Sequence, residues 1–278
     1  MPEGVEVKIV KEGLEKSLVG DTIMQVIFDD RGEKIARPLS EEELGEAVVG
    51  KEITSFNRIG KYIIFNFDDG TIMTSHLAMT GRWLIDVPAT HGLTHTRVMF
   101  VMKSGKIVRY SDVRLFGRIR IEDDLEKDYY NKGIDVLDAT EDEIYEKLLV
   151  VRKRRGENAI KKLLLNQRLF CGLGNVYSIE VLFDMKINPF KKINQLSDET
   201  LKLMAFTIKS ITQAGYEAGG LSLKDYVHVD GSKGSAQDLL QIYQKKECPV
   251  CGGEVSKVTR IDKRPTHYCK TCQNIENK

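Results

Sequence analysis

The second and third residues of the chain, Pro2 and Glu3, could carry out covalent chemistry. Removal of Met1 would leave the secondary amine of a proline at the N-terminus, beside a carboxylate. An α-amino group has a pKa of about 7.7 to 8.0, so much of it can be an unprotonated nucleophile near neutral pH. An imine formed by proline is a charged iminium, which withdraws electrons from the attached carbon. The pair is therefore a candidate nucleophile with its proton-transfer partner, and an ordinary leader segment is the alternative.

Four cysteines near the end of the chain have the spacing of a metal site. They form two Cys-x-x-Cys pairs separated by seventeen residues, so that two turns can each offer two thiolates to one tetrahedral Zn²⁺. Four thiolates leave no open coordination position, which indicates a structural rather than a catalytic ion. About 30 residues cannot bury an adequate core, so the metal should supply much of the local folding energy. We predict one structural Zn²⁺ per chain, bound by Cys248, Cys251, Cys269 and Cys272.

The segment between the two cysteine pairs is basic and contains Lys257, Arg260, Lys263 and Arg264. Pro265 and Thr266 follow Arg264, which is consistent with a turn that presents its guanidinium group to a phosphate. A surface arginine with no role is the alternative interpretation.

The charges of the 278-residue chain are unevenly distributed, although the formal net charge is only +1. Residues 121–147 contain eleven acidic side chains and three lysines, a balance of −8. Residues 150–170 contain seven basic side chains and one acidic side chain, a balance of +6. Such asymmetry is typical of proteins that contact nucleic acid, and two solvated helix faces are the alternative.

The residue pattern predicts two kinds of architecture along the chain. Apolar residues spaced three or four apart predict a helix over residues 3–18, directly after the candidate amine. Branched and aromatic runs at 53–67, 71–79, 97–102 and 106–110, separated by Asp-Gly and Ser-Gly turns, predict antiparallel hairpins. Helical patterns follow at 141–149, 159–165, 178–182 and 197–214, before a long loop rich in glycine, serine and aspartate.

These elements predict an α+β protein with three domains. We expect an N-terminal helix with an antiparallel β-sandwich over residues 1–130, a helical domain over 131–240 with a loop near 216–236, and a zinc module over 241–278. No apolar run approaches the eighteen or more residues of a membrane span, and the N-terminus lacks the pattern of a secretion signal. The cysteine spacing is not that of a disulfide framework. We therefore expect a soluble, cytoplasmic monomer, associated with the nucleoid if the source is bacterial.

Six motifs, met in order along nearly the whole chain, resemble those of the formamidopyrimidine-DNA glycosylase and endonuclease VIII family. They are Met1-Pro2-Glu3-Gly4, Gly60-Lys61-Tyr62, the run from His76 to Gly81, the run from Asp112 to Gly117, the run from Gly172 to Tyr177, and Arg264-x-Thr-x-x-Cys269-x-x-Cys272-Gln273. The resemblance implies base-excision repair enzymes that remove oxidised bases from damaged double-stranded DNA and then nick the abasic strand by β- and δ-elimination. It also implies a helix-two-turns-helix element in the helical domain and a zinc-finger β-hairpin.

The resemblance also implies a role for each matched residue. Pro2 would attack C1′ of the damaged nucleotide and form a Schiff base, and Glu3 would transfer protons at the opening sugar. Lys61 and Arg264 would hold phosphate near the lesion and assist catalysis. Glu6, one helical turn after Glu3, is a further catalytic candidate, and it could equally be a helix-start carboxylate favoured by the helix dipole.

Five further residues match DNA-binding positions of the family. A base inside a duplex must be extruded before it can be attacked, and Met79, Arg114 and Phe116 match the residues that fill the space it leaves. His95 and Asn175 match residues that contact DNA. Without the motif, we would interpret Met79 and Phe116 as residues of the strand core and Asn175 as a polar loop residue.

The sequence features that bear on the preferred lesion favour two different branches of the family. Gly4 is more typical of the endonuclease VIII branch, which prefers oxidised pyrimidines. The void-filling set and the loop from Ser222 to Gly231 are more similar to the formamidopyrimidine branch, whose loop covers an extruded 8-oxoguanine. We favour formamidopyrimidine and 8-oxoguanine as substrates. Val5 stands where most members have proline, which puts the aim of Glu6 in question.

Two other classes of protein are compatible with parts of the sequence. A non-catalytic zinc protein could bind damaged DNA through the basic hairpin and the loop at Asn175 without cutting a strand. An enzyme with an N-terminal proline could also act on small molecules, although the basic hairpin argues against it.

Overall fold

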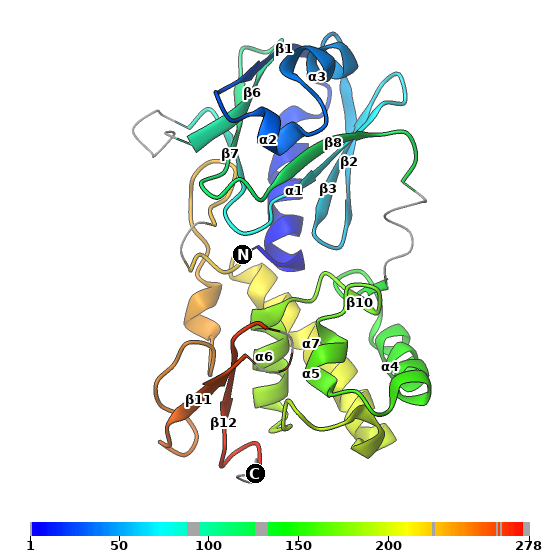
Figure 1. Cartoon of the computed structure of the whole chain (residues 1–278), viewed down its shortest axis with the longest axis vertical. Helices are drawn as coiled ribbons and strands as arrows, with labels where there is room; N and C mark the ends of the chain where they lie inside the picture. Colours follow the sequence, from blue (N-terminus) through cyan, green and yellow to red (C-terminus); the bar gives the residue numbers. More distant parts are fainter. Residues whose placement is uncertain are drawn as a thin grey trace. The chain divides into compact units, whose positions relative to one another are not determined.

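The computed structural model describes residues 2–87, 95–125, 133–223, 226–259, 261 and 263–274. The chain divides into two compact units, which we call unit 1 (Met1–Tyr130 with Ala218–Gln237) and unit 2 (Asn131–Glu217 with Asp238–Lys278) (Figure 1). The segment Ala218–Gln237 groups with unit 1, although its place in the chain suggested the helical domain. No helix in the described ranges is both long and apolar enough to cross a membrane.

Unit 1 begins with helix α1 (Gly4–Leu18), which starts directly after Glu3. Its apolar residues at intervals of three and four, from Val7 to Leu18, are buried and pack toward β2 and β3. The predicted N-terminal helix therefore forms because one stripe of its surface is apolar.

Unit 1 also contains two four-stranded antiparallel sheets (Figure 1). One sheet has the order β1-β6-β7-β5, with bounds β1 (Ile23–Phe28), β6 (Thr96–Met102), β7 (Ile107–Ser111) and β5 (Arg82–Ile85). The other has the order β2-β3-β4-β8, with bounds β2 (Ile53–Ile59), β3 (Tyr62–Phe67), β4 (Ile72–His76) and β8 (Arg118–Glu122). Two short helices, α2 (Glu33–Ala36) and α3 (Glu41–Val48), connect β1 to β2.

The sole tryptophan, Trp83, joins the two sheets. It lies on β5, is fully buried, and its ring centroid lies 5.2 Å from that of Phe65 on β3 of the other sheet. Its indole N–H donates a hydrogen bond to Ser75 Oγ on β4 at 3.0 Å, so the polar edge of the ring is also satisfied. The sheets thus pack face to face as the predicted sandwich.

Tyr110 on β7 fills the space between two irregular segments of unit 1. Its hydroxyl donates to the carbonyl of His76 at 3.0 Å, and the side chain is fully buried. A Cβ atom added to Gly81 would lie 2.3 Å from the Tyr110 hydroxyl, and one added to Gly117 only 1.8 Å. Glycine at both positions therefore lets the segments after β4 and β7 close onto the same phenol.

Unit 2 consists of helices with short pieces of sheet. Its helices are α4 (Glu141–Arg155), α5 (Ile160–Leu164), α6 (Asn175–Asp184) and α7 (Asp198–Glu217), with the 3-10 turn η2 (Ile193–Gln195). A parallel pair is formed by β9 (Ile134–Asp135) and β10 (Phe170–Cys171), and a hairpin by β11 (Val255–Val258) and β12 (Thr266–Cys269). A second 3-10 turn, η3 (Ala236–Leu239), lies at the return of the chain to unit 2. The predicted α+β class, with antiparallel sheets and a helical part, is confirmed.

The close approach of Gly117 to Tyr110 predicts a large penalty for one added methyl group. We expect Gly117→Ala to lower the free energy of unfolding by about 1–3 kcal/mol, because the core cannot take the extra atom without shifting. Gly45→Ala is the matched control: its Cβ would meet nothing within 4 Å, and alanine in a helix should stabilise by about 0.5–1 kcal/mol. Urea unfolding followed by Trp83 fluorescence measures both changes, and equal effects would contradict this packing.

Candidate functional site

The candidate catalytic pair lies at the start of α1. Pro2 and Glu3 are both buried, with Glu3 only 1% exposed. The backbone N–H of Glu3 donates to Glu6 Oε2 at 2.7 Å, which fixes the chain just before the helix begins. The carboxylate of Glu6 is itself 1% exposed and accepts a second hydrogen bond from the N–H of Leu221 at 2.9 Å. Glu6 is thus next to the pair, as its sequence position predicted, and it also binds a distant segment.

That distant segment, residues 218–237, forms a loop that folds back on itself. The N–H of Ser235 donates to the carbonyl of Ala218 at 2.7 Å, and the N–H of Gly234 donates to Ser222 Oγ at 3.0 Å. The carbonyl of Val229 accepts a hydrogen bond from the N–H of Ile85, at the end of β5, at 2.8 Å. The Ile85–Val229 bond and the Leu221–Glu6 bond attach the predicted lesion loop to the rest of unit 1 at two points. Two of its motif positions, residues 224 and 225, lie outside the described residues.

The three predicted void-filling residues gather on the surface of unit 1. The guanidinium of Arg114 donates to Met79 Sδ at 3.0 Å and lies 4.7 Å from the ring centroid of Phe116. Met79 is 38% exposed and Phe116 is 53% exposed, so neither packs as strand core. The arrangement presents two apolar side chains and one cation together to solvent.

A buried carboxylate holds the loop that carries Arg114 and Phe116. Asp112 is fully buried and accepts hydrogen bonds from the N–H groups of Arg114 at 3.0 Å and Gly117 at 2.7 Å. The hydroxyl of Thr80 also donates to this carboxylate. Asp112 therefore joins the Met79 segment to the Phe116 loop at their bases.

The other two predicted residues of unit 1 are His95 and Lys61. His95 is half-buried, and its Nδ1 accepts a hydrogen bond at 3.2 Å from Arg97, which also binds Asp29 at 2.5 Å. Lys61 is half-buried and follows Gly60, which has a φ of +60° in the turn between β2 and β3. The run at 53–67 is therefore an antiparallel hairpin, with Lys61 directly before β3.

Asn175 lies at the first turn of α6, in unit 2. The amine of Lys161, fully buried, donates to Asn175 Oδ1 at 2.9 Å and to Ser178 Oγ at 2.6 Å. Asn175 Nδ2 in turn donates to the carbonyl of Pro265 at 2.9 Å. Asn175 is thus a helix-start residue bonded to the turn that carries Arg264, whose side chain is exposed. The resemblance implies that Asn175 holds a phosphate together with Lys61 and Arg264, and the structure brings the segments of Asn175 and Arg264 together.

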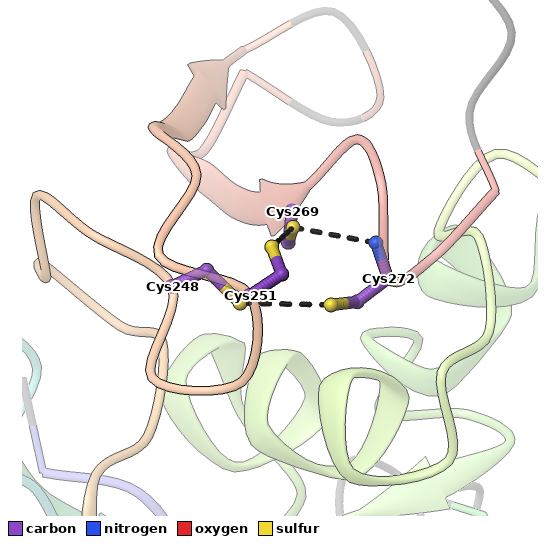
Figure 2. Close-up of side chains that lie close together, drawn as sticks. All are labelled: Cys248, Cys251, Cys269 and Cys272. Carbon is purple, nitrogen blue, oxygen red and sulfur yellow. Dashed lines mark hydrogen bonds between the residues drawn. The ribbon is translucent and has the colours of Figure 1, made fainter.

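The four predicted metal ligands face one another at the end of the β11–β12 hairpin (Figure 2). Their sulfur atoms all lie within 4.8 Å of one another. The Sγ atoms of Cys248 and Cys272 are 3.7 Å apart, and those of Cys251 and Cys269 are 3.5 Å apart. A tetrahedral ion with metal–sulfur bonds of about 2.3 Å needs sulfur atoms about 3.8 Å apart, so the cluster fits a metal ion.

A buried carboxylate on α6 holds the start of this module. Glu180 is 3% exposed and accepts hydrogen bonds from the backbone N–H groups of Gln241, Ile242 and Tyr243 at 2.8, 3.2 and 2.8 Å. Burial raises the pKa of Glu180, and the three N–H donors oppose that rise. From the other side, the amide of Gln273 donates to the carbonyls of Leu182 and Ile187.

The sequence does not predict three buried charged residues that hold the segments of the candidate site. Asp112, Lys161 and Glu180 are buried, charged, and bonded to several groups. Asp112 begins one of the six motifs, but the motif gives it no partner, and the signal of Lys161 and Glu180 in the sequence is only a charged residue within an apolar run. Of the basic residues between the cysteine pairs, Arg260 lies outside the described residues.

The candidate residues fall into the two units. Pro2, Glu3, Glu6 and Lys61 belong to unit 1, with His95 and the void-filling set, whereas Asn175, Arg264 and the cysteines belong to unit 2.

Known proteins resemble this chain over almost its whole length. A family model described as the formamidopyrimidine-DNA glycosylase N-terminal domain matches residues 1–119, and one described as the formamidopyrimidine-DNA glycosylase H2TH domain matches residues 136–227. The formamidopyrimidine-DNA glycosylases of Oceanobacillus iheyensis and Bacillus subtilis are 33% and 35% identical to it. These alignments cover 98% of this chain and 98% and 99% of those proteins.

Solved structures agree with the sequence comparisons. A Lactococcus lactis FPG mutant in complex with Fapy-dG containing DNA has a TM-score of 0.84 and 32% identity, covering 98% of this chain and 99% of that one. The complex of Lactococcus lactis Fpg with abasic-site DNA has a TM-score of 0.83 at the same identity and coverage. The chain therefore belongs to the formamidopyrimidine-DNA glycosylase family.

Proposed function

We propose that this protein is a bifunctional DNA glycosylase of base-excision repair that removes oxidised bases and nicks the resulting abasic strand. The observation that carries the proposal is the position of Pro2 and Glu3, buried at the start of α1 in a chain of this family. Relatives with known structures bind Fapy-dG and abasic-site DNA, which supports the same substrate class here.

The chemistry begins with the amine of Pro2, once Met1 is removed. Its lone pair attacks C1′ of the extruded nucleotide, the C1′–N bond to the base breaks, and the base leaves with the electron pair. The sugar ring opens to an iminium, which acidifies the C2′ proton. Loss of that proton expels the 3′ phosphate by β-elimination, and δ-elimination then expels the 5′ phosphate. Glu3 carries protons to and from the opening sugar.

Other residues hold the DNA during these steps. Lys61, Asn175 and Arg264 bind phosphates near the lesion, where their charges or amide hydrogens complement the backbone. Met79, Arg114 and Phe116 fill the duplex position that the extruded base leaves, and the exposure of their side chains in unit 1 suits that task. His95 also contacts the DNA. The enzyme acts on its DNA as a monomer.

We infer that formamidopyrimidine and 8-oxoguanine are the preferred lesions, because the described part of the 218–237 loop folds back on itself through hydrogen bonds and the chain has all three void-filling residues. Oxidised pyrimidines are the alternative. A non-catalytic damage-binding protein would bind the same DNA without nicking it.

The metal that suits the cysteine cluster is Zn²⁺, bound by Cys248, Cys251, Cys269 and Cys272 as a structural ion. Sulfur ligands and tetrahedral spacing favour it over magnesium or calcium. The ion would stabilise the hairpin that carries Arg264.

Borohydride trapping tests the proposed chemistry directly. Wild-type protein on duplexes containing 8-oxoguanine, formamidopyrimidine or an abasic site should form a covalent complex, because borohydride reduces the iminium. A variant with extra residues before Pro2 should form none, since its amine is blocked. Mass spectrometry of the mature N-terminus and of the trapped peptide is the measurement. Trapping through another residue, or none on any of the three duplexes, would reject the assignment.

Metal removal should abolish DNA binding while the fold of unit 1 stays intact. Elemental analysis should find one zinc per chain in wild type and in Cys171→Ala, whose thiol lies outside the cluster, but less than one in Cys248→Ala. Chelation should abolish DNA binding and leave the fluorescence of Trp83, in unit 1, unchanged. Full DNA binding by the metal-free protein would contradict the structural role of the ion.

A further inference from the structure

A single buried carboxylate connects the candidate catalytic pair to the 218–237 loop. One oxygen of Glu6 accepts the N–H of Glu3 at 2.7 Å, and the other accepts the N–H of Leu221 at 2.9 Å. The two donors are 218 positions apart in the chain. Glu6 thus bonds to the residue beside the Pro2 amine and to the first part of the loop.

The two bonds require a group that only accepts hydrogen bonds. An ionised carboxylate presents acceptors on both oxygens, whereas an amide has one acceptor and one donor. In Glu6→Gln the amide nitrogen would face one of the two backbone N–H groups, so one bond would be replaced by a contact between two donors. Both donors lie in a buried region, where an unpaired N–H is costly.

The packing around Gly220 brings the loop close to Glu6. Gly220 has a φ of +80°, and a Cβ atom there would lie 3.2 Å from Glu6 Cγ, Ile9 Cδ1 and Tyr226 Cε1. Glycine at this position therefore allows the loop backbone to rest on the side chain of Glu6. Tyr226 is 6% exposed, and burial first, then the negative charge of Glu6, raise its pKa.

The rest of the loop is attached to unit 1 without Glu6. Val229 accepts a hydrogen bond from Ile85 and packs against Gly13, where an added Cβ would lie 2.7 Å from Val229 Cγ2. Release of the Glu6 contact should therefore free the start of the loop while its second half stays in place.

We propose that Glu6 is a positioning residue that holds the start of the 218–237 loop beside the catalytic pair, so that the extruded base is enclosed while the Pro2 amine attacks it. The inference rests on the proposed function and deepens it. It assigns Glu6 no proton transfer. The two N–H donors fix the orientation of the Glu6 carboxylate, so this orientation does not need the proline that most family members have in place of Val5.

The two steps of the reaction should depend on Glu6 to different degrees. Base release needs the loop, because the base must be enclosed while C1′ is attacked. Processing of an abasic site has no base to enclose and needs only the amine and its proton-transfer partner. A catalytic carboxylate at Glu6 would serve both steps and would slow both when replaced.

Single-turnover assays on defined duplexes separate these roles. We expect Glu6→Gln to slow release of 8-oxoguanine or formamidopyrimidine by about 10- to 100-fold, the effect of one lost hydrogen bond to a charged group. Nicking and borohydride trapping of an abasic-site duplex should stay within about threefold of wild type. An equal loss on both substrates would overturn the positioning role.

Two glycine variants test the contact without changing Glu6. Gly220→Ala should slow base release because its Cβ pushes the loop away from Glu6. Gly231→Ala imposes a similar backbone penalty, with a φ of +84°, but its Cβ would meet only Val87 at 3.6 Å, so its loss should be smaller. Equal losses for the two variants would overturn the proposal.

Hydrogen exchange of the Leu221 amide tests the contact without catalysis, because this N–H donates to Glu6. Exchange should be faster in Glu6→Gln than in wild type, whereas the Ile85 amide, which donates to Val229, should exchange at the wild-type rate. An unchanged Leu221 rate would overturn the contact. A wild-type protein that neither releases bases nor traps abasic DNA would instead reject the proposed function.

Discussion

Buried carboxylates that accept several backbone N–H bonds hold the irregular segments of this protein. Glu6 binds the chain before α1 and the start of the 218–237 loop, Asp112 binds the loop that carries Phe116, and Glu180 binds the start of the cysteine module. An unsatisfied buried N–H costs about 1–3 kcal/mol, so segments without regular structure need such acceptors to stay ordered. The regular elements, in contrast, pair their own backbone groups and need only an apolar face.

The buried carboxylates fix segments that carry exposed side chains, which is what binding to DNA requires. Residues that contact DNA must be exposed and therefore lack support from a core, yet they must keep a fixed geometry. Met79, Arg114 and Phe116 are exposed side chains on segments whose bases are tied to Asp112 and closed around Tyr110. The fully buried Lys161 fixes Asn175 through a hydrogen bond. Asn175 in turn donates a hydrogen bond to Pro265, in the turn that carries Arg264.

The sequence predicts the regular elements and the cysteine cluster better than the long-range contacts that hold the irregular segments. The zinc spacing, the helix after Pro2 and the hairpins follow from local patterns, and the structure contains a cysteine cluster, a helix and a sandwich accordingly. The partner of Glu6 is 215 residues away in the chain, and Glu180 binds residues 61 to 63 positions later, so no local pattern reveals either contact. Local patterns also place the 218–237 loop in the helical domain, because they do not show the long-range bonds that attach it to unit 1.

Amide hydrogen exchange of the wild-type protein tests this account most directly. If the carboxylates hold the irregular segments, the N–H groups of Leu221, Gly117 and Ile242 should exchange as slowly as those of neighbouring strands and helices, because each must break a buried bond to exchange. Exchange of these three amides at the rate of exposed loop amides would contradict the claim that buried carboxylates order the functional segments.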